Sequence, residues 1–293
     1  MRCHYPVGII NKLGDHVYRP CGSCIGCRLE IARTWAVRCV HEASLHEQNC
    51  FLTLTYNNNH LPKFQNLEKS DLQKFIKRLR KYLDKSDKKI RYFGCGEYGS
   101  QTIRPHYHLC LFGHMFDDLK VVKYGKIYRF HETIRKQTYQ NNLYTSRKLQ
   151  DIWGKGYTTI GEVSFESAGY VARYVTKKIT GEKAHEHYKG KEPEFAVMSR
   201  KPGIGSDWIE KYMSDVYPKD FHTLNGKKMK PNRFYDERFK KMNPLGFEKL
   251  KERRSKQAKK QKDNPAAGRL KGYHKDRYTN AVTKSLKRGY END

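Results

Sequence analysis

The order of apolar patterns in the middle of the chain constrains its fold more than any other feature. Residues 51–56 (FLTLTY) are apolar and β-branched, which predicts a strand. Residues 70–84 repeat apolar side chains at helical spacing, and two strand-like segments follow at 91–99 and 106–113. Strands and helices that alternate in this way must bury one face of each against the other, which gives a layered fold.

The following residues extend this order. Residues 117–130 indicate an inserted hairpin, residues 142–153 a helix and residues 157–164 another strand. A last helix is expected to begin at a cap on Ser167. From residue 51 the order is therefore βαββαβ followed by a helix. It predicts an α+β fold with an antiparallel sheet and flanking helices, resembling the ferredoxin-like split βαβ arrangement.

The chain is expected to divide into three parts. Of its 293 residues, 1–48 form a cysteine-rich loop and helix, 49–225 the layered domain, and 226–293 a basic tail. The tail carries 22 Lys and Arg against 8 Asp and Glu, so its net charge of +14 is half of the +28 of the chain. Its segment KLKERRSKQAKKQKDN (residues 249–264) has no apolar stripe, and we expect it to be disordered or a loose helix that orders on its partner.

The charge of the whole chain indicates a polyanionic partner. Lys and Arg number 59 against 31 Asp and Glu, with 21 Tyr and 13 Phe among them. Cations bind phosphates and rings stack on unpaired bases, so nucleic acid is the expected partner. The alternatives are a solvated basic surface, a ribosomal-type protein or a membrane-surface protein. No apolar run approaches about 18 residues and no secretory signal is present, which predicts a soluble protein without a membrane partner.

Two histidines and a glutamate form the first candidate site. His106 and His108 are two residues apart on an expected strand, so both imidazoles point to one face. Glu97 on the preceding strand projects toward the same face if the two strands pair as a hairpin. Two imidazoles and a carboxylate make an open site that suits Mg²⁺ or Mn²⁺, the alternative being a polar sheet face. A second pair, His185 and His187, has no strand to align it and is interpreted as surface.

Two tyrosines form the second candidate site. Tyr170 and Tyr174 are four residues apart on an expected helix and therefore share one of its faces. Each is followed three residues later by a cation, Arg173 or Lys177. A nearby cation favours the phenolate and can hold a phosphate, which suits nucleophilic catalysis. The alternative is that both tyrosines only pack the helix onto the sheet.

The eight cysteines indicate thiols in a reducing compartment rather than a disulfide framework. Cys21, Cys24 and Cys27 form a C-x₂-C-x₂-C segment, and Cys3 is the plausible fourth thiolate. A structural Zn²⁺ is the simplest interpretation, with an iron–sulfur cluster or no metal as the alternatives. The remaining cysteines have apolar neighbours and are expected in the core: Cys39, Cys50, Cys95 and Cys110.

Taken together and in this order, FLTLTY, GEYG…RPHYHLCLFG and YVARYVTKK resemble the HUH endonucleases that initiate rolling-circle replication. CGSCIGC and SRKPGIG further resemble the gokushovirus branch of the Microviridae, which are single-stranded DNA phages. The resemblance implies that His106, His108 and Glu97 bind the metal and that the two tyrosines are nucleophiles assisted by Lys177. Arg173 stands where many relatives have Lys, which keeps the charge but not the ability to exchange a proton.

The resemblance also implies a reaction. One tyrosine would nick single-stranded or locally melted DNA at a replication origin, leaving a 5′-phosphotyrosine and a 3′-OH that primes synthesis, and the second would cut again before the ends are joined. The helicase and polymerase would be the host's, in the cytoplasm of a bacterial cell; consistently, no G-x-x-x-x-G-K-[ST] motif is present. The alternatives are a non-catalytic, zinc-containing single-strand binder, or a transposase or relaxase of the same HUH type.

Overall fold

The chain forms two compact units, seen in a computed structural model. The structure describes residues 3–10, 14, 16–84, 89–99, 102–123, 126–129, 137–140, 142–177, 182–217 and 219–262. We call Trp35–Ile204 the sheet unit, and Met1–Thr34 together with Gly205–Asp293 the terminal unit. Helix α1 (Ile25–Ala43) contributes residues to both. Among the described residues, no helix has the length and apolar character needed to cross a membrane.

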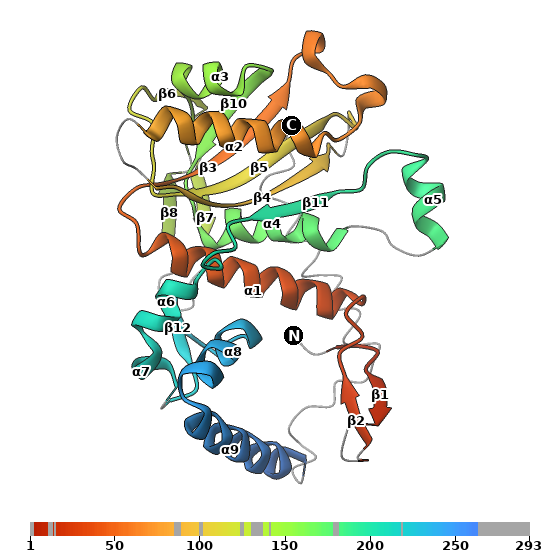
Figure 1. Ribbon diagram of the computed structural model, residues 1–293, viewed down its shortest axis with the longest axis vertical. Helices are drawn as coiled ribbons and strands as arrows, with labels where there is room; N and C mark the ends of the chain where they lie inside the picture. The colour runs from red at the N-terminus through yellow and green to blue at the C-terminus, as the bar shows by residue number, and fades with distance from the viewer. Residues whose placement is uncertain are drawn as a thin grey trace. The chain divides into compact units, whose positions relative to one another are not determined.

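A seven-stranded antiparallel sheet organises the sheet unit (Figure 1). Its strands are β3 (Asn49–Tyr56), β4 (Arg91–Tyr98), β5 (Pro105–Phe112), β6 (Lys120–Lys123), β9 (Leu143–Thr145), β10 (Gly156–Gly161) and β11 (Phe195–Met198). They pair in the order β11-β4-β5-β3-β10-β9-β6, and every neighbouring pair is antiparallel. The predicted α+β class with an antiparallel sheet is therefore confirmed, and its four central strands are those expected from the sequence.

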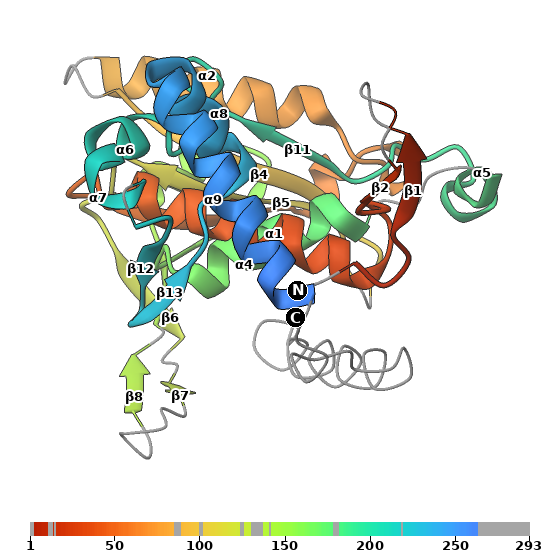
Figure 2. The same ribbon diagram turned by 90° about the horizontal axis from the view of Figure 1, so that it is seen from below.

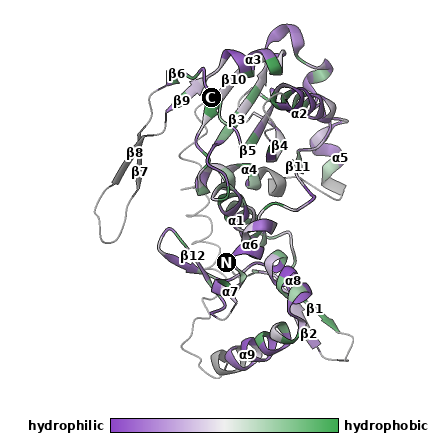
Figure 3. Cartoon of the chain, turned by 60° about the vertical axis from the view of Figure 1, so that its left-hand side comes forward, coloured by the Kyte–Doolittle hydropathy of each residue, from purple (hydrophilic) through white to green (hydrophobic). Residues whose placement is uncertain are grey.

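Helices α2 (Lys69–Asp84) and α3 (Arg147–Trp153) cover one face of this sheet. α2 is strongly amphipathic and shows both hydrophobic and hydrophilic residues in Figure 3. Its buried Phe75 meets Trp153 of α3 with ring centroids 6.0 Å apart. The indole Nε1 of Trp153 donates to the carbonyl oxygen of Thr55 at 3.1 Å, so the buried ring is also hydrogen-bonded. This face is the main hydrophobic core of the sheet unit.

A buried polar network fixes β3 and β5 beneath α2. The Tyr56 hydroxyl donates to Asp71 Oδ2 at 2.8 Å and lies 2.7 Å from the Tyr107 hydroxyl. Lys155 Nζ lies 3.2 Å from the same Asp71 oxygen. Burial raises the pKa of Tyr107, which therefore stays a neutral phenol. Because neighbouring residues of a strand point to opposite faces, this anchoring of Tyr107 also fixes the side chains before and after it on the other face.

On the other face, α4 (Phe165–Lys177) contacts β4, β5 and β11. Trp35 of α1 stacks on Phe93 of β4 with centroids 4.8 Å apart. α4 begins with a reciprocal pair, in which Ser167 N–H donates to Ser164 Oγ at 3.1 Å and Ser164 N–H donates to Ser167 Oγ at 2.8 Å. Ser164 is thus the cap, whereas the sequence analysis assigned that role to Ser167. The two serines fix where α4 starts relative to the sheet.

Two details of the sheet unit differ from expectation. The strand β11 was not expected; it pairs with β4, where Gly96 leaves room for the Phe195 ring, since a Cβ on that glycine would lie 2.8 Å from it. The hairpin expected within residues 117–130 is also wrong. β6 pairs with β9, while β7 (Lys126–Arg129) pairs with β8 (Gln137–Gln140), and the expected turn at Gly125 lies outside the described residues.

The terminal unit is built from short elements (Figure 2). They are β1 (Val7–Ile10), β2 (His16–Arg19), the start of α1, α6 (Ser206–Lys211), α7 (Met213–Val216), β12 (His222–Leu224), β13 (Lys227–Met229), α8 (Arg233–Met242) and α9 (Pro244–Lys262). Tyr235 of α8 is fully buried and stacks on Trp208 of α6 at 5.8 Å. The boundary expected at residue 225 falls between the paired strands β12 and β13.

Candidate active site

The pairing of β5 with its two neighbours gathers the first candidate site. Glu97 of β4 lies opposite His106, and Thr53 of β3 lies opposite His108. Directly opposed residues of an antiparallel pair point to the same face. The sheet register therefore brings the carboxylate and both imidazoles to the face that α4 covers.

The three side chains converge on one point. His106 Nε2 lies 2.9 Å and His108 Nε2 lies 2.7 Å from the same oxygen, Oε1 of Glu97. The two imidazole rings meet edge to face, with centroids 4.9 Å apart. All three residues are buried, with Glu97 only 1% exposed. One nitrogen from each ring and one carboxylate oxygen lie within 4.8 Å of one another, a spacing that allows them to ligate a single cation.

The far side of the His106 ring fixes its tautomer. Its Nδ1 lies 3.0 Å from the backbone carbonyl oxygen of Arg104. A carbonyl oxygen only accepts, so Nδ1 carries a proton, and in the neutral ring Nε2 then presents a lone pair to the Glu97 carboxylate. Two acceptors at 2.9 Å need a proton or a cation between them. A ring held by a carbonyl on one nitrogen and open at the other is the usual arrangement of a metal-binding histidine.

Thr53 does for His108 what the Arg104 carbonyl does for His106. Its Oγ1 lies 3.0 Å from His108 Nδ1, and the ring of Phe51 stacks on the same imidazole at 5.6 Å. The sequence analysis did not single out Thr53. The signal that leads to it is the register, because Thr53 is the residue of FLTLTY directly across from His108.

The charge of Glu97 suits a cation. Burial raises the pKa of this carboxyl, but hydrogen bonds from His106 and His108 outweigh it, so the pKa lies below its ordinary value and the group is ionised. Its second oxygen, Oε2, is buried and receives no hydrogen bond from any described residue. Nitrogen and oxygen ligands that leave coordination positions open fit Mg²⁺ or Mn²⁺, which retain waters or phosphate oxygens.

Tyr170 points into this group of ligands from α4. Its hydroxyl donates to Glu97 Oε1 at 3.2 Å, and its ring meets the His108 ring edge to face at 5.0 Å. The side chain is only 7% exposed. A phenol oxygen therefore lies beside the atoms that would hold a cation, which is where a nucleophile for a cation-bound phosphate has to be.

The other residues of the tyrosine motif lie on the same helix. The guanidinium carbon of Arg173 lies 5.6 Å from the Tyr170 ring centroid, within the range of a cation–π contact. Tyr174 is one helical turn after Tyr170, and Lys177 is the last residue of α4. For these two residues the structure describes the backbone, so their predicted roles stay predictions.

The chain was compared with known proteins. A family model of phage replication-associated proteins, described by its member ORF2, matches residues 49–179. The chain is 34% identical over 269 residues to "Replication-associated protein VP4" of Bdellovibrio phage phiMH2K, an alignment covering 83% of this chain and 79% of that protein. The chain belongs to the replication-associated proteins of Microviridae-like phages. The resemblance inferred from the motifs is confirmed.

Further members of this family are also similar to the chain. "Replication-associated protein ORF2" of Spiroplasma virus 4 is 36% identical over 255 residues, which cover 82% of this chain and 74% of that protein. "Replication-associated protein ORF4" of Chlamydia phage 1 is 31% identical over 228 residues, or 76% of this chain and 54% of that protein. No solved structure matches significantly. The family-model match, which spans residues 49–179, includes Glu97, His106, His108 and both tyrosines of α4.

A second ligand group lies outside the matched range of this replication-associated protein. Cys3, Cys21, Cys24 and Cys27 bring their sulfurs within 4.8 Å of one another. The Cys3 and Cys24 sulfurs are 3.8 Å apart, and those of Cys21 and Cys27 are 4.0 Å apart. A disulfide needs about 2.05 Å, whereas a tetrahedron with Zn–S bonds of about 2.3 Å has edges of about 3.8 Å. The sulfurs are therefore spaced for a tetrahedral ion.

Backbone N–H groups surround these sulfurs. Cys21 N–H donates to Cys3 Sγ at 3.2 Å, His4 N–H to Cys24 Sγ at 3.4 Å and Cys24 N–H to Cys21 Sγ at 3.3 Å. The N–H groups of Cys24 and Ser23 lower the pKa of Cys21 to about 6, whereas burial raises the pKa of Cys27 to about 12. Donors aimed at sulfur stabilise thiolates, the form that binds a metal.

The remaining four thiols lie elsewhere, in the sheet unit. They are all fully buried, as the sequence predicts, and burial raises the pKa of Cys50 above its ordinary range: Cys39, Cys50, Cys95 and Cys110. All eight cysteines are free thiols. The chain therefore separates its cysteines into four that pack in the core and four that form a ligand group.

Proposed function

We propose that this replication-associated protein is an HUH-type endonuclease and strand transferase that initiates rolling-circle replication. Its substrate is single-stranded or locally melted DNA at the phage replication origin. The observation that carries the proposal is the 3.2 Å contact between the Tyr170 hydroxyl and Glu97 Oε1, the oxygen on which His106 and His108 also converge. A nucleophile and a set of cation ligands then act on the same phosphate.

The reaction balances without an added energy source. The phenol oxygen of a tyrosine attacks the phosphorus, a new P–O bond to tyrosine forms and the P–O3′ bond breaks. The electron pair leaves with O3′, and the proton lost by the phenol is matched by the proton that O3′ gains. The product is a 5′-phosphotyrosine and a free 3′-OH. Since the phosphodiester energy is kept in the covalent link, the reverse attack by a 3′-OH rejoins DNA without ATP.

Four residues of α4 take distinct roles in this proposal. Tyr170 and Tyr174 are the two nucleophiles, so that a second cut can be made while the first link persists. Arg173 and Lys177 supply positive charge to the scissile phosphate and its neighbours. Lys177 can also exchange a proton, which Arg173 cannot do.

Two different metal ions complete the proposed protein. Glu97, His106 and His108 would hold Mg²⁺ or Mn²⁺, which as a Lewis acid polarises the scissile phosphate. The four cysteines of the terminal unit would hold a structural Zn²⁺, for which their spacing and their N–H donors are the support. The host polymerase would extend the 3′-OH, and a host helicase would open the duplex in the cytoplasm of the bacterial cell.

A cleavage assay tests the proposal. Labelled single-stranded oligonucleotides that tile the genome encoding the chain are incubated with the protein and Mn²⁺. We expect one oligonucleotide to be cut at a single position, with its 3′ fragment attached to the protein and its 5′ fragment ending in a free 3′-OH. Chelation of the cation should stop the reaction, and fresh Mn²⁺ should restore it.

Two outcomes would contradict this proposal. Cleavage that continues in excess EDTA would exclude the cation, and cleavage that leaves no protein-bound fragment would exclude the tyrosine nucleophile. If no oligonucleotide is cut while several are bound tightly, the protein is a single-strand binder.

A further inference from the structure

Helix α9 is firmly attached to the terminal unit along one of its sides. Leu250 is buried, and Phe247, the only aromatic residue of α9, packs on Phe239 of α8 with centroids 6.4 Å apart. Arg254 donates to both oxygens of Asp220, at 2.9 and 2.6 Å, and to Asp236 at 2.8 Å. The charge of this arginine is therefore balanced by two carboxylates within the unit.

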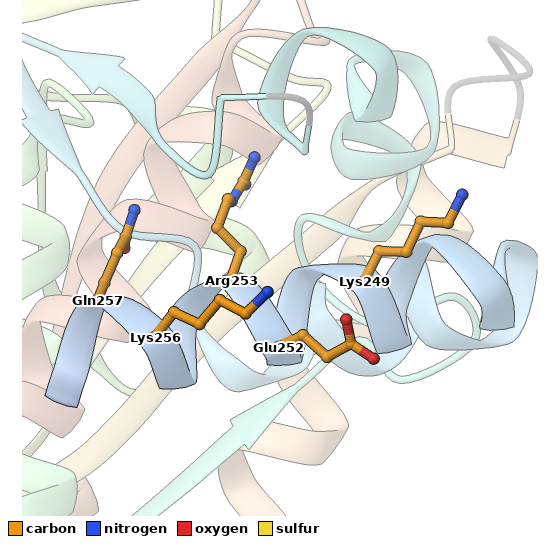
Figure 4. A pocket seen from close by; sticks show the side chains of 5 residues that line it. All are labelled: Lys249, Glu252, Arg253, Lys256 and Gln257. Carbon is orange, nitrogen blue, oxygen red and sulfur yellow. The ribbon is translucent and has the colours of Figure 1, made fainter.

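A different side of α9 presents cations to solvent. Lys249, Arg253 and Lys256 are exposed and, at about 100° per residue, lie within one narrow sector of the helix. With Gln257 and Glu252 they line a shallow groove of about 340 Å³ (Figure 4). Three cations face one carboxylate there, so the groove is positively charged.

We propose that this side of α9 binds the phosphate backbone of duplex DNA next to the origin strand that is cut. Long basic side chains on a fixed helix bind phosphates through charge and counterion release. The side of α9 that carries them has no ring on which an unpaired base can stack, which favours duplex over single strand. The 19 residues of α9 form a rod about 28 Å long, and the major groove admits an α-helix.

The proposal rests on the proposed function only in taking DNA as the partner. Binding is measured without cleavage, so a protein that binds duplex but never nicks would leave this inference intact and overturn the other. Conversely, normal nicking of a short single strand by a protein whose α9 does not bind duplex would overturn this inference alone.

The test compares two sets of three charge-neutralising substitutions on exposed helix faces. One variant is K249Q/R253Q/K256Q on α9, and the matched control is K74Q/K77Q/K81Q on the exposed side of α2. The probes are a 20-base-pair duplex and a 20-nucleotide single strand, titrated by fluorescence anisotropy at several salt concentrations. The α9 variant should bind the duplex at least tenfold more weakly, with a salt slope smaller by about 2 to 3, since each phosphate contact contributes about 0.9.

The control variant should keep the wild-type slope, and the single strand should bind the α9 variant within about twofold of wild type. Equal losses in both variants would mean that only total charge matters and would overturn the proposal. Equal losses of duplex and single strand in the α9 variant would overturn the preference for duplex. The charge-preserving variant K249R/R253K/K256R should bind like wild type; if it fails although circular dichroism shows it folded, the positive charge is not what binds.

Discussion

The two ligand groups of this protein are built in different ways. Glu97, His106 and His108 come from paired strands, and the sheet register alone sets their distances. The cysteine group comes from a loop and from the start of α1, where spacing along the chain and backbone N–H groups set them. The first group offers three ligands of mixed type and the second offers four sulfurs.

The contrast has a chemical consequence. Four thiolates close a tetrahedron and leave no position for a substrate, as in structural zinc sites. Two imidazoles and a carboxylate leave positions open for a phosphate oxygen, and a phenol already lies beside them. We therefore expect loss of the first group to remove catalysis and loss of the second to remove stability.

The largest effect is expected from the histidines. His106→Ala with His108→Ala should lower cleavage by about a thousandfold or more, because a Lewis acid contributes several kcal/mol to the transition state. Binding of single-stranded DNA should change by less than about threefold, since it depends on phosphate and stacking contacts. The matched control replaces the exposed pair His185 and His187 by Ala and should cleave normally. Equal activity of both double variants would remove the catalytic role of the sheet group.

The cysteine group should respond in the opposite way. Cys21→Ser with Cys24→Ser should lose about one zinc per chain, measured by elemental analysis, and lower the Tm by about 10 °C, since zinc binding is coupled to folding. At low temperature the variant should still cleave. Cys39→Ala is the control, because it removes a buried thiol outside the group and should retain zinc. Iron with visible absorbance in anaerobically purified protein would replace zinc by an iron–sulfur cluster.

Thr53 allows a finer test of the sheet group. Thr53→Val keeps the shape but loses the contact to His108 Nδ1, and should weaken Mn²⁺ affinity about tenfold, the lower end for outer ligand contacts. Thr53→Ser should restore it. Thr55→Val is the matched control, because Thr55 lies opposite His106, whose ring is held by a backbone carbonyl. Calorimetric titration of Mn²⁺ measures the difference, and an equal loss in both valine variants would mean that Thr53 only contributes to folding.

The smallest effect on oligonucleotide cleavage is expected from single tyrosine changes. Tyr170→Phe and Tyr174→Phe keep the rings and remove one hydroxyl each, so each variant should cut within about tenfold of wild type by using the other phenol. Closure of a circle should need both, because one phenol is still esterified when the second cut is made. A circle-forming assay on a substrate with two origin sites separates the two steps. Closure by either single variant would mean that one nucleophile suffices.

Much of the fold was predictable because its signals are local. The strand at 51–56, the amphipathic helix after it and the next two strands each carry their own periodicity, and Glu97 meets His106 because β4 and β5 are neighbours in the chain. The spacing of Cys21, Cys24 and Cys27 is likewise local. These are the features that the sequence analysis found.

The features it missed depend on contacts between distant residues. β11 is a half-buried four-residue strand whose place at the edge is decided by its pairing with β4. Thr53 matters through its register with His108, which lies 55 residues away. Residues 249–262 lack an apolar stripe, yet they continue α9, because Leu250 is buried and Arg254 finds Asp220 and Asp236. The tail from residue 263 on lies outside the described residues.

The central claim, that a phenol of α4 attacks a phosphate at the sheet group, has one most direct measurement. Wild-type protein is allowed to react with its origin strand in Mn²⁺, the product is digested with trypsin and nuclease, and the nucleotide-bearing peptide is identified by mass spectrometry. The account predicts that the nucleotide is esterified to Tyr170 or Tyr174, and that Tyr170→Phe moves it to Tyr174. A nucleotide on any other of the 21 tyrosines, or a double Phe variant that still forms the adduct, would contradict it.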